Sequence, residues 1–141
     1  MLKLALLPGT FAVCRLPAGA LIPGWASLGP ADLCSVTRTR DELSIVVDEA
    51  RVPSGLPVEA GWKAFQVAGP LAFSLTGVIA SLVGPLADVR IGVFVVSTFD
   101  TDYLLVKAAD VERAAAVLAR AGHTITSAGD GDAAAAAKPA P

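Results

Sequence analysis

Residues 61–107 read GWKAFQVAGPLAFSLTGVIASLVGPLADVRIGVFVVSTFDTDYLLVK, and this stretch decides the predicted fold. It opens with an apolar run at 62–67, which predicts a strand. Two later apolar runs, Ile91–Ser97 and Tyr103–Lys107, predict two more strands separated by a polar turn. The clearest helical pattern of the chain lies between the first and second runs. The order strand, helix, strand, strand is therefore expected here.

The predicted helix has one apolar face, because its large apolar residues recur every three or four positions. Ser74 is a candidate N-cap, and Pro85 is expected to kink or end the helix near its last turn. The opposite face carries small residues, which permit close approach to a sheet or to another helix. The apolar face consists of Leu75, Val78, Ile79, Leu82, Val83 and Leu86.

The residues that follow complete the pattern. Asp110–Ala121 predicts a second helix, which Gly122 is suited to terminate. Residues 123–126 predict a last strand, with His123 at the surface or at a strand edge. The order strand, helix, strand, strand, helix, strand is the split βαβ arrangement of ferredoxin-like α+β folds. We expect an antiparallel sheet with both helices on one face.

The first sixty residues predict strands without room for two full helices. Residues 17–30 are rich in Pro and Gly and allow one or two helical turns, and residues 49–61 are expected to form a loop. Strands are expected at Leu2–Leu7, Phe11–Leu16, Cys34–Arg38 and Leu43–Asp48.

The two halves of the chain can be aligned at an offset of 60 residues. The identities are few, but both halves share a strand, a glycine turn, and two strands around a polar turn. We interpret this as an internal repeat whose units bury surface on each other. Residues 1–60 would be a degenerate unit, and residues 61–127 a complete one. The alignment places Gly9 on Gly69, Val36-Thr37 on Val96-Ser97, Glu42-Leu43 on Asp102-Tyr103 and Ile45-Val46 on Leu105-Val106.

Composition argues against several classes of function. The net charge is −2 and the 11 Lys and Arg residues are scattered, so a nucleic-acid partner is not expected. His123 is the only histidine, and both cysteines, Cys14 and Cys34, lie in apolar runs typical of reduced core cysteines. A metal site is therefore not expected. The chain has no nucleophile motif, phosphate loop or dinucleotide fingerprint, so we expect neither an enzyme nor a cofactor.

One segment is long and apolar enough to suggest a membrane span. Val67–Ala87 carries no charge over 21 residues. It is interrupted by Gly69-Pro70 and Gly84-Pro85, so a strand end, a loop and a buried helix are the preferred interpretation, with a membrane-associated protein as the alternative. A cytoplasmic location is expected. Residues 128–141, rich in Ala, Gly, Asp and Pro, are expected to be a disordered tail.

Two segments, GPLAFSLTGVIASL at 69–82 and VSTFDTDYLLV at 96–106, carry a resemblance to ACT-domain proteins of the CASTOR type. The resemblance extends over residues 2–125. It implies tandem ACT units, ligand-dependent regulation, no catalysis and self-association, so that a homodimer is expected. Ala72 departs from the acidic or polar residue that is common at this position of the family.

The first candidate site is the loop that leads into the predicted helix. A helix start leaves backbone N–H groups unpaired, and these attract an anion such as the carboxylate of an amino acid. An ordinary capped helix is the alternative, and the resemblance favours a ligand. The candidate residues are Gly69, Pro70, Leu71, Ser74, Leu75, Thr76, Gly77 and Val78.

The second candidate site is the polar turn Thr98-Phe99-Asp100-Thr101-Asp102. Asp100 and Asp102 could accept from an ammonium or guanidinium group, and Phe99 could cover an aliphatic stem. The alternative is an ordinary hairpin turn. From the expected strand order, we predict that this turn meets the first site only across an interface between units or copies.

Together these features predict a non-enzymatic regulatory module that holds a free amino acid at an interface between two ACT units. The alternative is a structural or protein-interaction ACT module without a small-molecule ligand, which the apolar composition and the small-residue helix face fit equally well.

Overall fold

The apolar positions of the predicted βαββαβ stretch form one hydrophobic core in the computed structural model, which describes residues 1–27 and 31–127. The chain divides into two compact units. Unit 1 contains Met1–Pro8 and the chain from Lys63 onward, and unit 2 contains Gly9–Trp62. The predicted α+β fold is confirmed. The expected disordered tail at 128–141 lies outside the described residues.

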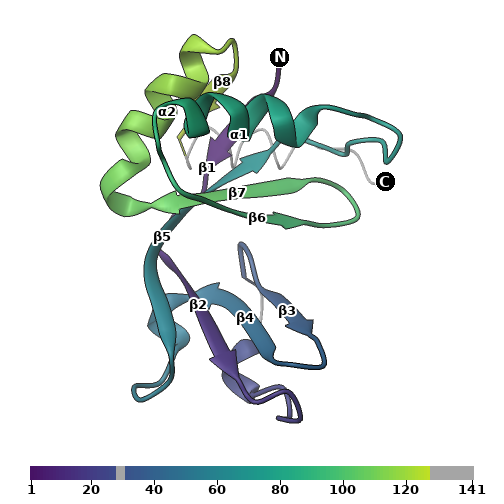
Figure 1. Ribbon diagram of the computed structural model, residues 1–141, viewed down its shortest axis with the longest axis vertical. Coiled ribbons are helices and arrows are strands. Elements are labelled where there is room, and N and C mark those ends of the chain that lie inside the picture. Colours follow the sequence, from purple (N-terminus) through teal and green to yellow (C-terminus); the bar gives the residue numbers. More distant parts are fainter. Residues whose placement is uncertain (28–30, 128–141) are drawn as a thin grey trace. The chain divides into compact units, whose positions relative to one another are not determined.

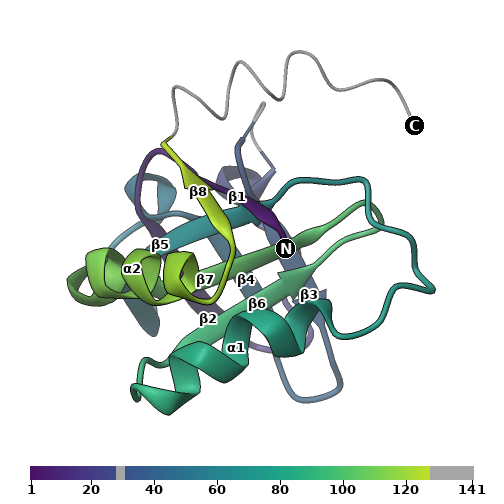
Figure 2. The same ribbon diagram turned by 90° about the horizontal axis from the view of Figure 1, so that it is seen from above.

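Unit 1 is a five-stranded sheet with two helices. Its strand order is β8-β1-β5-β7-β6, and α1 and α2 cover one face of the sheet (Figures 1 and 2). The elements are β1 (Lys3–Leu6), the end of β5 (Val58–Val67), α1 (Val78–Asp88), β6 (Val93–Ser97), β7 (Asp102–Lys107), the 3-10 turn η3 (Ala108–Asp110), α2 (Val111–Arg120) and β8 (Thr124–Thr126).

Strand β1 changes the expected sheet. It lies between β5 and β8, antiparallel to β5 through Leu4↔Val67 and parallel to β8 through Leu4↔Ile125. The sheet is therefore mixed rather than wholly antiparallel. The expected first unit of residues 1–60 also differs from the observed one, because β1 belongs to unit 1. The partners of β1 in the sheet, β5 and β8, are far from it in sequence, so no local pattern reveals them.

Unit 2 is a four-stranded antiparallel sheet in the order β3-β4-β2-β5. The residues expected to form a loop at 49–61 instead contain a 3-10 turn and the start of β5 at Val58. In its described residues the helical elements are two 3-10 turns, and none is an α-helix. The elements are β2 (Phe11–Leu16), η1 (Gly24–Ala26), β3 (Ser35–Arg38), β4 (Leu43–Asp48), η2 (Glu49–Arg51) and the first half of β5.

Helix α1 continues through Pro85 to Asp88, although Pro85 was expected to kink or end it. Proline has no N–H to donate to the carbonyl four residues earlier, which leaves Ser81 O without its helical donor. His123 Nε2 lies 3.1 Å from that oxygen, and Leu2 N donates to His123 Nδ1 over 3.2 Å. Since Nδ1 accepts, the ring proton sits on Nε2 and is donated to Ser81 O. His123 was expected at the surface or at a strand edge. It is only 7% exposed, so the surface alternative was wrong, but it lies directly before the edge strand β8.

The two cysteines occupy different environments, so the expectation of two core cysteines was half wrong. Both are free. Cys14 is buried among apolar residues of unit 2, and burial raises the pKa of its thiol. Cys34 lies just before β3, is exposed, and donates from Sγ to Ala26 O over 2.8 Å.

We expect one fast and one slow thiol when the native protein is titrated with a thiol-specific reagent at neutral pH. The thiolate is the reactive form, so the raised pKa and the burial of Cys14 both slow its reaction. Cys34 should react at least about a hundredfold faster, because Cys14 is reached only through local opening. Stopped-flow labelling followed by mass mapping measures this ratio, and Cys34→Ser should remove the fast phase alone. A fast phase that persists in Cys34→Ser would contradict the burial of Cys14.

Candidate functional site

The loop that leaves β5 is fastened to the β6–β7 turn within unit 1. Leu71 N donates to Asp100 O over 2.7 Å, and Thr101 Oγ1 donates to Val67 O. A Cβ atom at Gly69 would lie only 2.8 Å from Asp100 O. A residue without a side chain is therefore required where the two loops meet.

This contact corrects the expectation that the two candidate sites meet only across an interface. Both loops leave the same end of the unit 1 sheet (Figures 1 and 2). Strand β5 pairs with β7, and β7 pairs with β6, so the end of β5 lies beside the turn that joins β6 and β7. The two segments are therefore neighbours within one unit.

Thr98 holds the β6–β7 turn in shape. Thr98 N donates to Thr101 O over 2.8 Å, and Thr101 N donates to Thr98 Oγ1 over 3.2 Å. The threonine hydroxyl thus replaces a backbone partner inside the turn. Thr101 is 4% exposed, whereas Phe99 at the tip is 79% exposed. These bonds shape a turn in which Thr101 is buried and Phe99 is exposed.

Two carboxylates face the region between the loops. Ser97 Oγ donates to Asp102 Oδ1 over 2.6 Å, which fixes that carboxylate at the last pair of the β6–β7 hairpin. Asp102 is half-buried. Asp100 is half-buried in the adjoining turn. No Lys, Arg or His is found among the described residues that line this region, so the site favours a cation.

Two aromatic side chains meet above the carboxylates. The rings of Phe73 and Phe99 pack edge to face, with centroids 5.0 Å apart and an interplanar angle of 81°. This is a favourable aromatic geometry. Both side chains remain more than three-quarters exposed, at 76% and 79%. They form an apolar rim that joins the two loops.

Helix α1 starts three residues later than expected. Its N-cap is Gly77, with φ of 79°, and Ser81 N donates to Gly77 O over 2.9 Å. Ser74 was wrongly predicted as the cap, and Leu75 lies in a turn in which its N–H donates to Ala72 O. Glycine takes the left-handed conformation without strain, which favours Gly77 at this position. The N–H groups of the first helical turn, at 78–80, have no intrahelical acceptor.

These elements enclose an open cavity of about 360 Å³. Nine of the thirteen predicted residues line it, namely Leu71, Leu75, Gly77, Val78, Thr98, Phe99, Asp100, Thr101 and Asp102. Four predicted residues, Gly69, Pro70, Ser74 and Thr76, do not line it. Sequence reasoning missed Ala72, Phe73, Ile79, Ala80 and Ser97. The alternation of β6 could have identified Ser97, but nothing in the sequence marks Phe73 as a partner of Phe99.

Among residues 1–27 and 31–127, no group of three or more His, Cys, Asp or Glu side chains could hold a metal ion. In the same ranges, no helix is both long and apolar enough to cross a bilayer. Helix α1 accordingly contains only part of the apolar run 67–87.

Unit 1 thus combines a mixed sheet, two helices and a cavity between two loops. The sequence profile of the ACT domain matches residues 58–120, and a second profile, for an N-terminal domain, matches residues 9–55. The chain belongs to the ACT-domain proteins. The resemblance to the CASTOR type is confirmed by its relatives.

The chain is 38% identical over 90 residues to the human protein CASTOR3P, with 55% of each chain covered. It is 30% identical over 97 residues to the cytosolic arginine sensor for mTORC1 subunit 1 of Bos taurus, covering 61% of this chain and 30% of that protein. The chain thus spans about half or less of these curated relatives. The crystal structure of protein Atu0741 from Agobacterium tumefaciens is 45% identical, with a TM-score of 0.83, and covers 89% of this chain and 92% of that one.

Proposed function

We propose that this protein is a non-enzymatic regulatory module that binds a free amino acid in the cavity of unit 1. The observation that carries the proposal is the pairing of two half-buried carboxylates, Asp100 and Asp102, with the amino-terminal turn of α1 across one cavity. A zwitterion needs both an anionic and a cationic partner. The carboxylates supply acceptors for an ammonium or guanidinium group, and the free N–H groups at 78–80 supply donors for a carboxylate.

The size and rim of the cavity agree with a small ligand that has an aliphatic part. A volume of about 360 Å³ is at the lower end of the range for small-molecule sites. Phe73 and Phe99 offer an apolar surface above the carboxylates. Because one relative is an arginine sensor, we propose a basic amino acid as the first ligand to test.

The exposed rim also supports an ACT–ACT interface as the other wall of the site. Two phenylalanines more than three-quarters exposed beside a ligand would be covered by a second copy of the chain. We therefore propose a homodimer whose assembly is coupled to the ligand. We further propose that the two units of this chain are a tandem repeat, and that the protein acts in the cytoplasm, as the name of its bovine relative states for that protein.

A thermal-shift screen of the twenty amino acids tests the proposal. A ligand at a hundred times its Kd stabilises the fold by about 2.7 kcal/mol, which raises Tm by roughly 10 °C for a chain of this size. Asp102→Asn keeps the shape of the side chain and removes its charge, so the shift should disappear. Asp88→Asn, at the exposed end of α1, is the matched control and should keep it.

No shift with any amino acid at millimolar concentration, while the fold stays intact, would overturn the proposal. The same exposed residues, Phe73, Leu75 and Phe99, favour the second candidate, an interaction module without a ligand. That candidate predicts a constant oligomeric state in size-exclusion chromatography, with and without amino acids. The first candidate predicts a state that changes with the ligand.

A further inference from the structure

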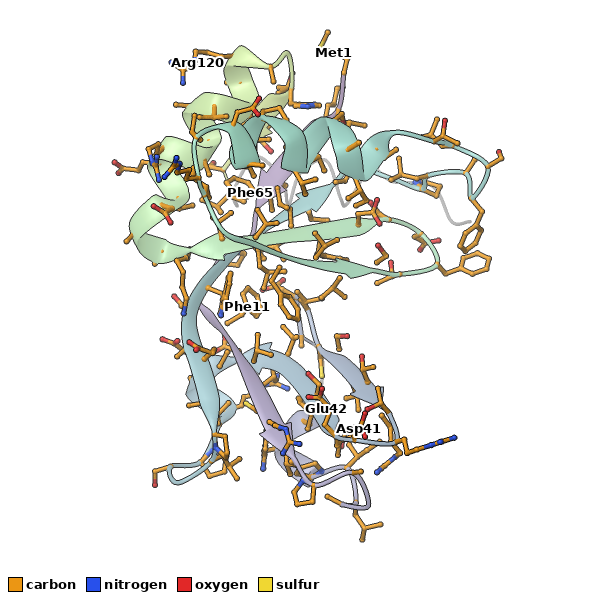
Figure 3. All side chains as sticks on the ribbon, viewed as in Figure 1. Met1, Phe11, Asp41, Glu42, Phe65 and Arg120 are labelled. Atoms are coloured by element: carbon orange, nitrogen blue, oxygen red, sulfur yellow. The ribbon has the colours of Figure 1, made fainter. Side chains whose placement is uncertain are left out.

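The two units contain the same hairpin turn. In unit 2, Thr39 N donates to Glu42 O over 2.8 Å and Glu42 N donates to Thr39 Oγ1 over 3.2 Å. Thr98 and Thr101 make the same pair of bonds over the same two distances in unit 1. Asp41 and Glu42, labelled in Figure 3, belong to the unit 2 turn. Each turn joins two strands that occupy the same positions in their sheets.

Strand pairing then fixes which residues are equivalent. The last pair before the turn is Arg38↔Leu43 in unit 2 and Ser97↔Asp102 in unit 1. The hairpins therefore correspond at an offset of 59 residues, which corrects the offset of 60 taken from sequence identities. Arg38 occupies the position of Ser97, and Leu43 occupies the position of the pocket carboxylate Asp102.

Arg38 is exposed, and it bridges the turn and the loop of unit 2 at the place that corresponds to the cavity of unit 1. Its guanidinium donates from Nη1 to Ala18 O and from Nη2 to Ala20 O, the latter over 2.8 Å. Both acceptors lie in the loop that leaves β2, just as the cavity loop of unit 1 leaves β5. In unit 1 the turn and loop are joined directly, through Leu71 N and Asp100 O. In unit 2 the equivalent oxygen, Asp41 O, accepts from Arg15 Nη2 over 3.1 Å, and the side chain of Arg38 makes the connection to the loop.

We propose that unit 2 contains a guanidinium site that is filled by its own Arg38. The planar fork of arginine matches two carbonyl oxygens spaced along one loop, and an ammonium group cannot match them in the same way. The Arg38 guanidinium holds the loop after β2 to the turn of unit 2. Unit 1 is then the unit that is open to a ligand. Once Arg38 is removed, the two carbonyls form a site for small guanidinium compounds. This inference depends on the shared turn and not on what binds in unit 1.

Hydrogen exchange measured on the full chain tests the inference. Arg38→Ser copies the residue found in unit 1, and it should speed amide exchange in residues 18–22 by about five- to tenfold, the scale expected for the loss of solvent-exposed hydrogen bonds. The Ala20 amide, whose N–H donates to Pro17 O, is the main reporter. Methylguanidinium at 20 mM should restore the exchange rate to within about twofold of the wild-type rate. Methylammonium at the same concentration should not, and neither compound should change the wild type.

Two further variants keep the test decisive. Arg40→Ala removes an exposed arginine from the same turn and should leave exchange at 18–22 unchanged. Arg38→Lys keeps the charge without the fork, so it should behave like Arg38→Ser and respond to methylguanidinium. Wild-type protection in Arg38→Ser would overturn the inference. Protection restored equally by methylammonium, or not restored by methylguanidinium, would overturn it as well.

Discussion

Phe65→Ala is expected to destabilise unit 1 by about 3–5 kcal/mol, the usual cost of emptying a buried phenylalanine site. Phe65 is 0% exposed in β5 and packs in one cluster with Leu82 and Leu86 of α1 and Leu118 of α2 (Figure 3). The ring therefore belongs to a core that both helices and the sheet share, and its loss leaves a cavity inside that core. Equilibrium unfolding in urea, followed by circular dichroism, measures the change.

A loss of this size approaches the whole stability of a small domain, so a milder variant is needed beside it. Phe65→Leu keeps much of the volume and should cost about 1–1.5 kcal/mol. Phe99→Ala is the control for the aromatic side chain itself, because Phe99 is 79% exposed; it should cost less than about 0.5 kcal/mol. Comparable losses for Phe65→Ala and Phe99→Ala would contradict the position of Phe65 in the core.

Gly69→Ala is expected to cost about 2–3 kcal/mol and to abolish amino-acid binding in unit 1. The new methyl group would lie 2.8 Å from Asp100 O and 3.1 Å from the Cβ of Thr101. A backbone oxygen cannot rotate away as a flexible side chain can, so the turn must shift as a body. That shift breaks the bond from Leu71 N to Asp100 O and displaces Asp102. Thermal unfolding and amino-acid titration of the variant measure the two effects.

Gly84→Ala provides the matched comparison. Gly84 lies inside α1, and a Cβ built there meets nothing within 4 Å. The substitution should stabilise the protein by about 0.5–1 kcal/mol, because alanine favours the helix over glycine. Binding should be unaffected. If both glycine variants gave the same result, the close approach of the loop to the turn at Gly69 would not be the cause.

Local patterns predicted the regular elements well. Strands β2 and β4 have the expected bounds, and α2 and β8 differ from the prediction by a residue or two. The periodicity of apolar residues sets these elements because each buries one face. The predicted start of α1 was wrong because Ser74 was taken as the N-cap. The helix instead begins after Gly77, which has the left-handed conformation.

Features that depend on distant residues could not be predicted in the same way. Nothing near Pro85 shows that His123 supplies the missing donor to Ser81. The sequence marked both halves of the candidate site, but their joining through Gly69 and Asp100 depends on the strand order of unit 1. The equivalence of Arg38 and Ser97 likewise emerges only from the hydrogen bonds of the two turns.

The position of β1 has a consequence for how the chain folds as it is synthesised. Strand β1 leaves the ribosome well before both of its partners, the end of β5 and then β8, since Leu2 and His123 are 121 residues apart. Unit 2 lies entirely between these two and is complete once Trp62 has emerged. We therefore expect the inserted unit to fold first, β1 to pair with the end of β5 next, and unit 1 to close only after β8 has been made. Cotranslational folding thus runs from the inserted unit to the unit that surrounds it in the sequence.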